Sequence, residues 1–314
     1  MLKKLKLFAI MAFAFSVVLN SCTENSTNPN TPGTEPKPLP VSNLMATSIN
    51  NETIAIKFDA SPSETNTLFK DYQVVMTPGT FAPVFLNKGE SEAQFTNLSE
   101  GTIYKFEIVA RYTNDSISTI SSIEWSPATR FELSNNDALI RVYESASDLG
   151  SGLRMFSPMP DNAPRTYTIA NSAEWDLALY TKDGKLTFGS ATKAPYSYAN
   201  APQTVQMFAD TFQADSLSAL FDSKAMNAGD RDTKYTERVE DLAAINSAKN
   251  IVFYVRKYEA GQTRYNYAKV MVKKNGASYL QGTAPNRYVE VQISYQKTAD
   301  VPYAKISKNN SSSK

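Results

Sequence analysis

The sequence predicts a mainly β protein, in which a β-sandwich near the N-terminus is followed by an α+β domain dominated by antiparallel sheet. In residues 38–131, short segments of alternating apolar and polar residues are separated by turn residues, as in an all-β sandwich. From residue 132 onward the alternation continues, but two apolar patterns with helical spacing interrupt it. We therefore expect two folded parts, at residues 39–131 and 132–307.

The first 21 residues have the layout of a signal peptide. Three lysines precede an apolar run over residues 7–19 that only Ser16 interrupts. A run of about 13 residues is too short to span a bilayer stably, whereas a positive segment followed by a short apolar one is typical of a cleaved export signal. We expect residues 1–21 to be removed.

Residues 19–22, Leu-Asn-Ser-Cys, resemble the lipobox of bacterial lipoproteins. In that family the cysteine sulfur takes a diacylglycerol and becomes the first residue of the mature protein; Asn20 departs from the usual pattern. Cys22 is the only cysteine in the chain, so an intrachain disulfide is excluded and lipidation is its expected role. The resemblance implies a protein held by its lipid in the cell envelope, at the outer membrane, on the periplasmic or surface-exposed face. An unmodified leftover cysteine is the alternative.

Residues 22–38 are rich in Asn, Thr, Ser and Pro and cannot bury enough surface to offset the entropy lost on ordering. We expect them to form a flexible lipidated tether, and the polar residues 308–314 to form a disordered tail.

Loss of the three signal-peptide lysines changes the formal charge from +1 to −2. A nearly neutral chain gives no electrostatic support for binding nucleic acid.

The first folded part contains a recognisable spacing between a leucine and a tyrosine. The spacing of Leu98 and Tyr104 resembles the tyrosine corner of fibronectin type III domains, in which the phenol hydrogen-bonds the backbone. Phe58 stands where that family usually has a buried tryptophan. The resemblance implies a fibronectin type III-like sandwich over residues 39–131. Such modules in bacterial surface proteins are commonly spacers or binding platforms, and the fold alone names no ligand.

The second part contains seven strand-like segments and two helix-like ones. The expected strands cover residues 139–143, 166–170, 175–181, 185–189, 250–258, 265–274 and 287–295. The expected helices cover residues 215–221, which begin with an Asp suited to an N-cap, and residues 236–245, which carry acidic residues in the first turns.

The best-defined segment is a hairpin with its turn near Gly261 and Gln262. If Tyr258 faces Tyr265, one face is apolar and consists of Ile251, Phe253, Val255, Ala268, Val270 and Val272. The other face collects aromatic and cationic side chains, which are Tyr254, Arg256, Tyr258, Tyr265, Tyr267 and Lys269. We predict that these six residues bind a flat or sugar-like ligand by stacking, and that the cations attract carboxylates. The alternative is that another segment covers this face and the tyrosines belong to a core.

Residues 174–179, Glu-Trp-Asp-Leu-Ala-Leu, resemble a strand common in the HmuY-like haem-binding lipoproteins of Bacteroidetes, and residues 267–270 and 289–295 resemble the closing strands of those proteins. The resemblance implies haem as a candidate cofactor. The best-known members coordinate haem iron through histidines, and this chain has none. Because methionine can also ligate haem iron, Met207 and Met226 are the candidate metal ligands. Gap-filling in a core is the alternative role for both.

The composition argues against an enzyme. Without histidine the chain lacks the commonest general base and the usual hydrolase dyads. A glycosidase would need two carboxylates about 5 to 10 Å apart. The candidate groups are Glu174 with Asp176, Asp230 with Asp232, and Glu237 with Glu240 and Asp241. We interpret them as solvated or capping residues. Asp222, Asp230 and Asp232 are the residues available for a calcium site. Such a site is disfavoured because they lack the glycine and terminal glutamate of a calcium-binding loop.

Taken together, the sequence predicts a non-catalytic, envelope-anchored lipoprotein whose C-terminal domain binds haem or a glycan. The alternative is a structural lipoprotein that docks an envelope protein partner and binds no small molecule. A carboxylate-dependent glycosidase is a minor alternative.

Overall fold

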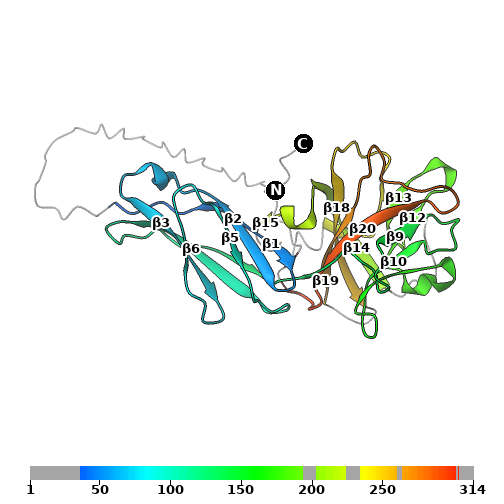
Figure 1. The fold of residues 1–314 in the computed structure, drawn as a ribbon, viewed down its shortest axis with the longest axis horizontal. Coiled ribbons are helices and arrows are strands. Elements are labelled where there is room, and N and C mark those ends of the chain that lie inside the picture. The colour runs from blue at the N-terminus through cyan, green and yellow to red at the C-terminus, as the bar shows by residue number, and fades with distance from the viewer. Residues whose placement is uncertain (1–35, 194–202, 224–233, 260–263, 302, 304–314) are drawn as a thin grey trace, which may run out of the picture. The chain divides into compact units, whose positions relative to one another are not determined.

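The computed structural model describes residues 36–193, 203–223, 234–259, 264–301 and 303, and the regular structure in this part of the chain is almost entirely antiparallel strand (Figure 1). The mainly β fold class is thus confirmed. The signal peptide, Cys22, most of the tether, the tail and Met226 lie outside the described residues.

The first sandwich consists of two antiparallel sheets that enclose one core. The first has the order β15-β1-β2-β5, with β1 Ser42–Asn50, β2 Thr53–Asp59, β5 Glu92–Phe95 and β15 Asp222–Ser223. The second has the order β4-β3-β6-β7, with β3 Phe69–Thr77, β4 Val84–Leu86, β6 Tyr104–Tyr112 and β7 Ser121–Trp125. A 3-10 turn, η1 (Pro62–Thr65), lies between β2 and β3. Every second residue of β6 is buried, as a strand with one face on a core requires.

The tyrosine corner is present in this sandwich. The side chain of Tyr104 is buried, and the backbone N–H of Ser99 donates to its hydroxyl over 3.0 Å. Leu98 is buried beside it. Phe58 is buried as well and packs edge-on against Tyr72, with 5.0 Å between the ring centroids. The prediction of a fibronectin type III-like sandwich is therefore confirmed in its core.

The C-terminal part forms a second sandwich. Its smaller sheet has the order β11-β10-β12-β13-β17, with β10 Gly152–Ser157, β11 Ala163–Tyr167, β12 Leu177–Tyr180, β13 Thr187–Ser190 and β17 Val239–Asp241. Its larger sheet has the order β16-β14-β18-β19-β20-β8, and β9 also pairs with β20; the bounds are β8 Thr129–Phe131, β9 Ile140–Tyr143, β14 Gln203–Ala214, β16 Tyr235–Thr236, β18 Asn250–Glu259, β19 Asn266–Val272 and β20 Tyr288–Tyr295. The core between the sheets includes the six apolar hairpin residues.

Both helix predictions are wrong. Residues 215–221 contain only a 3-10 turn, η4 (Leu217–Ala219), and lead directly into β15, which pairs with β1. Residues 236–245 contain the end of β16 and the whole of β17, which pairs with β13. Two further 3-10 turns, η2 (Ile169–Glu174) and η3 (Lys182–Gly184), flank β12. Pairing with a distant sheet edge overrides a weak local helical preference here.

The predicted hairpin register is confirmed. Tyr254 pairs with Lys269, and Lys257 pairs with Asn266, which places Tyr258 opposite Tyr265. Their rings meet edge-on, with 5.2 Å between the centroids. The turn residues themselves lie outside the described part of the chain.

The two sandwiches are continuous, and the described residues from Lys37 onward belong to one compact unit. β8, which we assigned to the first part, pairs with β20 of the larger C-terminal sheet, and β15 of the C-terminal part pairs with β1 of the first sandwich. Between them, Gln296 donates through its side-chain amide to the carbonyl oxygen of Pro127 over 2.6 Å, and both side chain and acceptor are buried. In chain order, the described strands therefore belong to the first sandwich up to β7, to the C-terminal sandwich from β8 to β14, to the first again at β15, and to the C-terminal one from β16 onward.

Candidate functional site

The six residues predicted to bind a ligand share one face of the β18–β19 hairpin, but four of them are buried. Tyr254, Arg256, Tyr267 and Lys269 are each at most 3% exposed, whereas Tyr258 and Tyr265 are partly exposed. Tyr254 and Tyr267 belong to the same apolar cluster as the core of the first sandwich. The open stacking surface that the sequence led us to expect is therefore absent at these four positions. Trp125 and Asp222 lie against Lys269, and Tyr235 of β16 lies against Arg256 and Tyr267.

Lys269 lies in an enclosed cage of opposite charge and aromatic rings. Its ammonium is 2.7 Å from a carboxylate oxygen of Asp222, and it also donates to the carbonyl oxygen of Leu220 over 2.9 Å. The hydroxyl of Tyr254 donates to the other carboxylate oxygen of Asp222. Three ring centroids lie within 5.4 to 6.0 Å of the ammonium, those of Tyr254, Tyr303 and Trp125. The cation is thus neutralised inside the protein and is not presented to a ligand.

Burial sets the titration of this cage. It raises the pKa of the Asp222 carboxyl, against the opposing effect of the Lys269 ammonium and the Tyr254 hydroxyl. It also raises the pKa of Tyr254, and the carboxylate of Asp222 adds to that effect. Burial therefore opposes ionisation of both groups, and the Lys269 ammonium and the Tyr254 hydroxyl are what favour the charged form of Asp222.

Two residues of the predicted face, Tyr258 and Tyr265, are partly exposed, and the buried Arg256 lies beside them. Arg256 stacks on the ring of Tyr265 at 4.1 Å and on that of Tyr235 at 5.0 Å, and its Nε donates to the side-chain oxygen of Gln206 over 2.7 Å. Tyr265 in turn contacts Tyr258. Ligand binding by Tyr258 and Tyr265 stays a prediction.

Met207, a predicted haem ligand, is fully buried in the core of the C-terminal sandwich, between paired residues of β16 and β18. Its sulfur fills space between the two sheets, which is the alternative role that the sequence allowed. Met226 lies outside the described residues. Within the described ranges, no cluster of three or more Asp, Glu or Cys side chains is arranged to hold a metal ion.

The acidic residues considered for catalysis are mostly engaged with cations. Asp176 was interpreted as solvated or capping, but it is buried, 3.0 Å from the ammonium of Lys257, and accepts from the backbone N–H of Met155 over 2.8 Å. It therefore joins the two sheets of the C-terminal sandwich. Ion pairs also hold three more of these acids, which are Glu174 with Arg154, Glu240 with Arg238, and Asp222 with Lys269. Asp241 instead accepts from the backbone N–H of Ala243 over 3.0 Å, as a capping residue does, and Glu237 forms none of these ion pairs. Asp230 and Asp232 lie outside the described residues.

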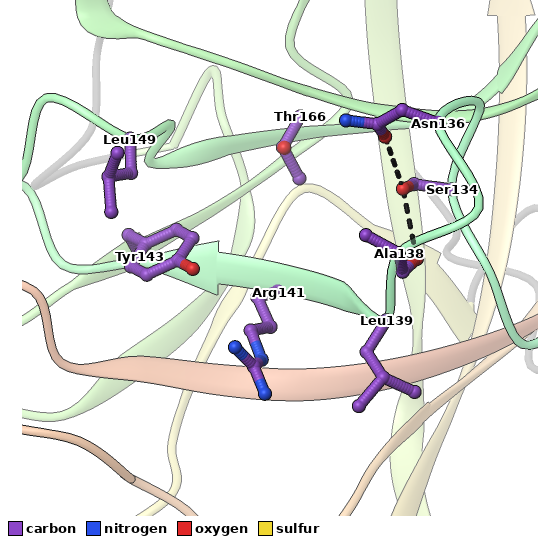
Figure 2. Close-up of a pocket in the computed structure, with 8 residues that line it drawn as sticks. All are labelled: Ser134, Asn136, Ala138, Leu139, Arg141, Tyr143, Leu149 and Thr166. Atoms are coloured by element: carbon purple, nitrogen blue, oxygen red, sulfur yellow. Dashed lines mark hydrogen bonds between the residues drawn. The ribbon is translucent and has the colours of Figure 1, made fainter.

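A pocket of about 410 Å³ lies at the outer side of β9. Ile140 and Val142 of this strand point into the core, so the residues between and beside them, Arg141 and Tyr143, face outward. Figure 2 shows the residues that line the pocket, which come from β9, β11 and two loops: Ser134, Asn136, Ala138, Leu139, Arg141, Tyr143, Leu149 and Thr166.

One wall of the pocket is a closed turn. The backbone N–H of Ser134 donates to the carbonyl oxygen of Ala138 over 2.8 Å, and the N–H of Asp137 donates back to Ser134 over 3.1 Å. The hydroxyl of Ser134 lies 2.7 Å from the side-chain oxygen of Asn136, as the dashed line in Figure 2 marks. The same hydroxyl lies 3.0 Å from the carbonyl oxygen of Ala138, and Figure 2 shows the amide nitrogen of Asn136 on the side of Thr166.

The floor of the pocket contains a stacked cation. The guanidinium of Arg141 lies 4.4 Å from the ring centroid of Tyr288, and that ring lies 5.4 Å from the ring of Tyr143. Sequence reasoning missed this site. It placed a strand at residues 139–143, but only the pairing of β9 with β20 brings Tyr288 beside Arg141.

Comparison with known proteins identifies one part of the chain. A family model described as "Fibronectin type III domain" matches residues 39–124. Among curated proteins no match is found. Among solved structures, an fn3 domain of the human collagen alpha-1(XX) chain is 18% identical, with a TM-score of 0.26, and the match covers 30% of this chain and 88% of that one. The FN5 domain of Drosophila Lar is 15% identical, with a TM-score of 0.22, and the match covers 29% of this chain and 97% of that one.

Within the described ranges, no helix has the length and apolar character needed to cross a bilayer. The matched residues coincide with the two-sheet sandwich that carries the buried Phe58 and the tyrosine corner of Tyr104. Residues 39–124 are a fibronectin type III domain.

Proposed function

We propose that this protein is a non-catalytic lipoprotein of the cell envelope that binds a glycan in the pocket beside β9. The observation that carries the proposal is the composition of that pocket. Tyr143 offers a ring for the C–H face of a sugar, while Asn136, Thr166 and Arg141 offer polar groups for its hydroxyls. The combination of an apolar surface and convergent polar groups suits a ligand that has both.

The location follows from the sequence features at the N-terminus. The cleavable export signal and Cys22 supply the anchor, and the proline-rich residues 22–38 supply a tether. A tether holds the binding pocket at a distance from the membrane, which suits a ligand that lies on or outside that membrane.

In this proposal the fibronectin type III domain is a fixed spacer. It is joined to the C-terminal sandwich by β15 on its first sheet, by the buried pair of Lys269 and Asp222, and by the bond from Gln296 to Pro127. Because of these links, the spacer fixes where the pocket lies relative to the fibronectin type III domain. The two sandwiches cannot separate without exposing a charged pair.

A second candidate function is docking of an envelope protein partner on the fibronectin type III domain. The observation that favours it is Phe85 on the edge strand β4, which is 51% exposed and packs on the guanidinium of Arg111 at 4.6 Å. Arg111 is in turn held by two hydrogen bonds to Asp71. An exposed aromatic residue on a fixed cation is a feature of protein interaction surfaces.

A glycan array with the full-length protein in detergent tests the main proposal. We expect one class of glycan to bind, and Tyr143→Ala to lose that binding while Tyr258→Ala retains it. Tyr258 is the matched control because it is a partly exposed tyrosine of the originally predicted site. Binding to no glycan, or loss in Tyr258→Ala alone, would refute the pocket. Haem titration followed by visible absorbance examines the other ligand class; a new haem-protein absorbance band would favour haem over a glycan.

A further inference from the structure

Arg141 differs from most arginines in the described ranges because it has no acidic partner there. The arginines that form ion pairs are Arg111, Arg130, Arg154, Arg165, Arg238, Arg264 and Arg287. The guanidinium of Arg141 makes no ion pair or hydrogen bond with the described residues, and its Nε is buried without a partner. A charged donor that has no hydrogen-bond acceptor within the protein favours binding an acceptor from outside the chain.

The nearest acid across the sheet is already engaged. Glu290 of β20 pairs directly with Arg141 of β9 in the strand register. Its carboxylate, however, accepts from the ammonium of Lys273 over 2.6 Å, and Glu290 is only 8% exposed. The internal carboxylate is thus held on the β19 side of β20, and the positive charge of Arg141 remains at the pocket.

Arg141 is also held in place before any ligand arrives. Its guanidinium stacks on Tyr288, whose backbone exchanges two hydrogen bonds with Gln281 at 2.8 and 2.9 Å. Gly282 lies against the same ring, since a Cβ at that position would be 3.2 Å from Cε1 of Tyr288. A planar cation fixed on a ring loses little freedom when it forms paired hydrogen bonds to an anion.

We propose that the pocket selects glycans that carry an anionic group, a carboxylate or a sulfate, and that Arg141 binds that group. The inference rests on the proposed function. A guanidinium presents parallel N–H groups that match the two oxygens of a carboxylate, and it binds sulfate oxygens in the same way. The anion sits over Arg141 while the sugar ring lies toward Tyr143 and the amide of Asn136. The pocket lining itself contains no acidic residue to oppose it.

The experiment compares matched pairs of glycans on the full-length protein in detergent, by calorimetry or biolayer interferometry. One pair is a uronic acid polymer and its methyl ester; the other is a sulfated glycosaminoglycan and its desulfated form. We expect the charged member of at least one pair to bind about tenfold or more tightly, which is the size of one good charged contact. The pair that shows the difference identifies carboxylate or sulfate as the source.

Arg141→Gln should abolish the preference for the charged member and leave the melting temperature nearly unchanged. Arg141→Lys keeps the charge without the paired N–H groups and should keep only part of the preference. The matched control is Arg165→Gln on the neighbouring strand β11, because Arg165 also stacks on a tyrosine, Tyr167 at 5.0 Å, but does not line the pocket. That variant should retain the full preference.

Equal binding of charged and neutral members would overturn the selectivity while leaving glycan binding intact. Loss of the preference in Arg165→Gln, or its survival in Arg141→Gln, would also overturn it. Binding of no glycan at all, or of an acidic peptide in place of the glycans, would overturn both the selectivity and the proposed function.

Discussion

The ammonium of Lys269 and the carboxylate of Asp222 lie 2.7 Å apart, and each side chain is 1% exposed. Lys269 belongs to the larger C-terminal sheet, while Asp222 is on the strand that pairs with β1 of the fibronectin type III domain. One of the two cations that we expected to attract a ligand carboxylate pairs instead with a carboxylate of its own chain. At four of its six residues, the face that we expected to be a binding site is internal.

Lys269→Met should destabilise the protein by about 3 to 5 kcal/mol, because it leaves Asp222 buried without its counter-charge. The double variant Lys269→Met with Asp222→Leu should recover most of that loss. Urea denaturation of the three proteins measures the effect. A single variant as stable as the wild type would show that the pair contributes nothing to the junction.

The stability of the C-terminal sandwich should depend on pH through Glu144. Hydrogen bonds from Arg287 lower the pKa of its carboxyl, and Thr181 adds a further bond. A lowered pKa means that the stabilisation is complete above the unfolded-state value of about 4.3 and is lost as pH falls through the folded-state value.

Denaturation of the wild type and Glu144→Gln at pH 7, 5 and 3 tests this dependence. The stability difference between the two proteins should shrink at pH 3. The matched control is Glu132→Gln, because Glu132 pairs with Arg130 but is 54% exposed, and exposed pairs contribute little. A gap between wild type and Glu144→Gln that stays constant from pH 7 to pH 3 would contradict the assignment.

The tyrosine corner should contribute measurably to the fibronectin type III domain. Tyr104→Phe removes the acceptor of the Ser99 N–H and should cost about 1 to 3 kcal/mol. Leu98→Ala, beside it, should cost about 2 to 5 kcal/mol by leaving a cavity. Thermal melts followed by far-UV circular dichroism give both values, and glycan binding at the β9 pocket should be unaffected when measured well below the melting temperature.

Anchoring should depend on one residue. Cys22→Ser should leave an uncleaved precursor and abolish palmitate labelling, since no other thiol is present in the sequence to take the lipid. Metabolic labelling with palmitate followed by gel mobility provides the measurement. Labelling that persists in the variant would mean that the lipoprotein assignment is wrong.

Local patterns in the sequence were sufficient to predict the first sandwich and the hairpin register. Alternation placed Ile251, Phe253 and Val255 on the core face, and the spacing of Leu98 and Tyr104 predicted the corner. All seven C-terminal segments predicted as strands overlap a strand in the structure. These features depend on neighbours in sequence, where periodicity is informative.

Features that depend on distant partners were not predictable in this way. Strand β14 was missed because a register shift between Met207 and Thr211 breaks its alternation. The sequence also could not predict which residues cover Tyr254 and Lys269, because Trp125 and Asp222 come from other sheets. The pocket was missed for the same reason, because Tyr288 becomes a neighbour of Arg141 only through the sheet.

The short strand β15 bears on whether copies of the protein can associate with one another. The outer edge of β1 would otherwise offer free backbone groups at Met45 and Ala46, where a second copy could add a strand and begin an aggregate. A protein concentrated on a membrane surface, as we propose, meets its own copies often. To pair there, an intruding strand must first pull Asp222 away from Lys269, so the electrostatic pair that joins the sandwiches also opposes self-association at this edge.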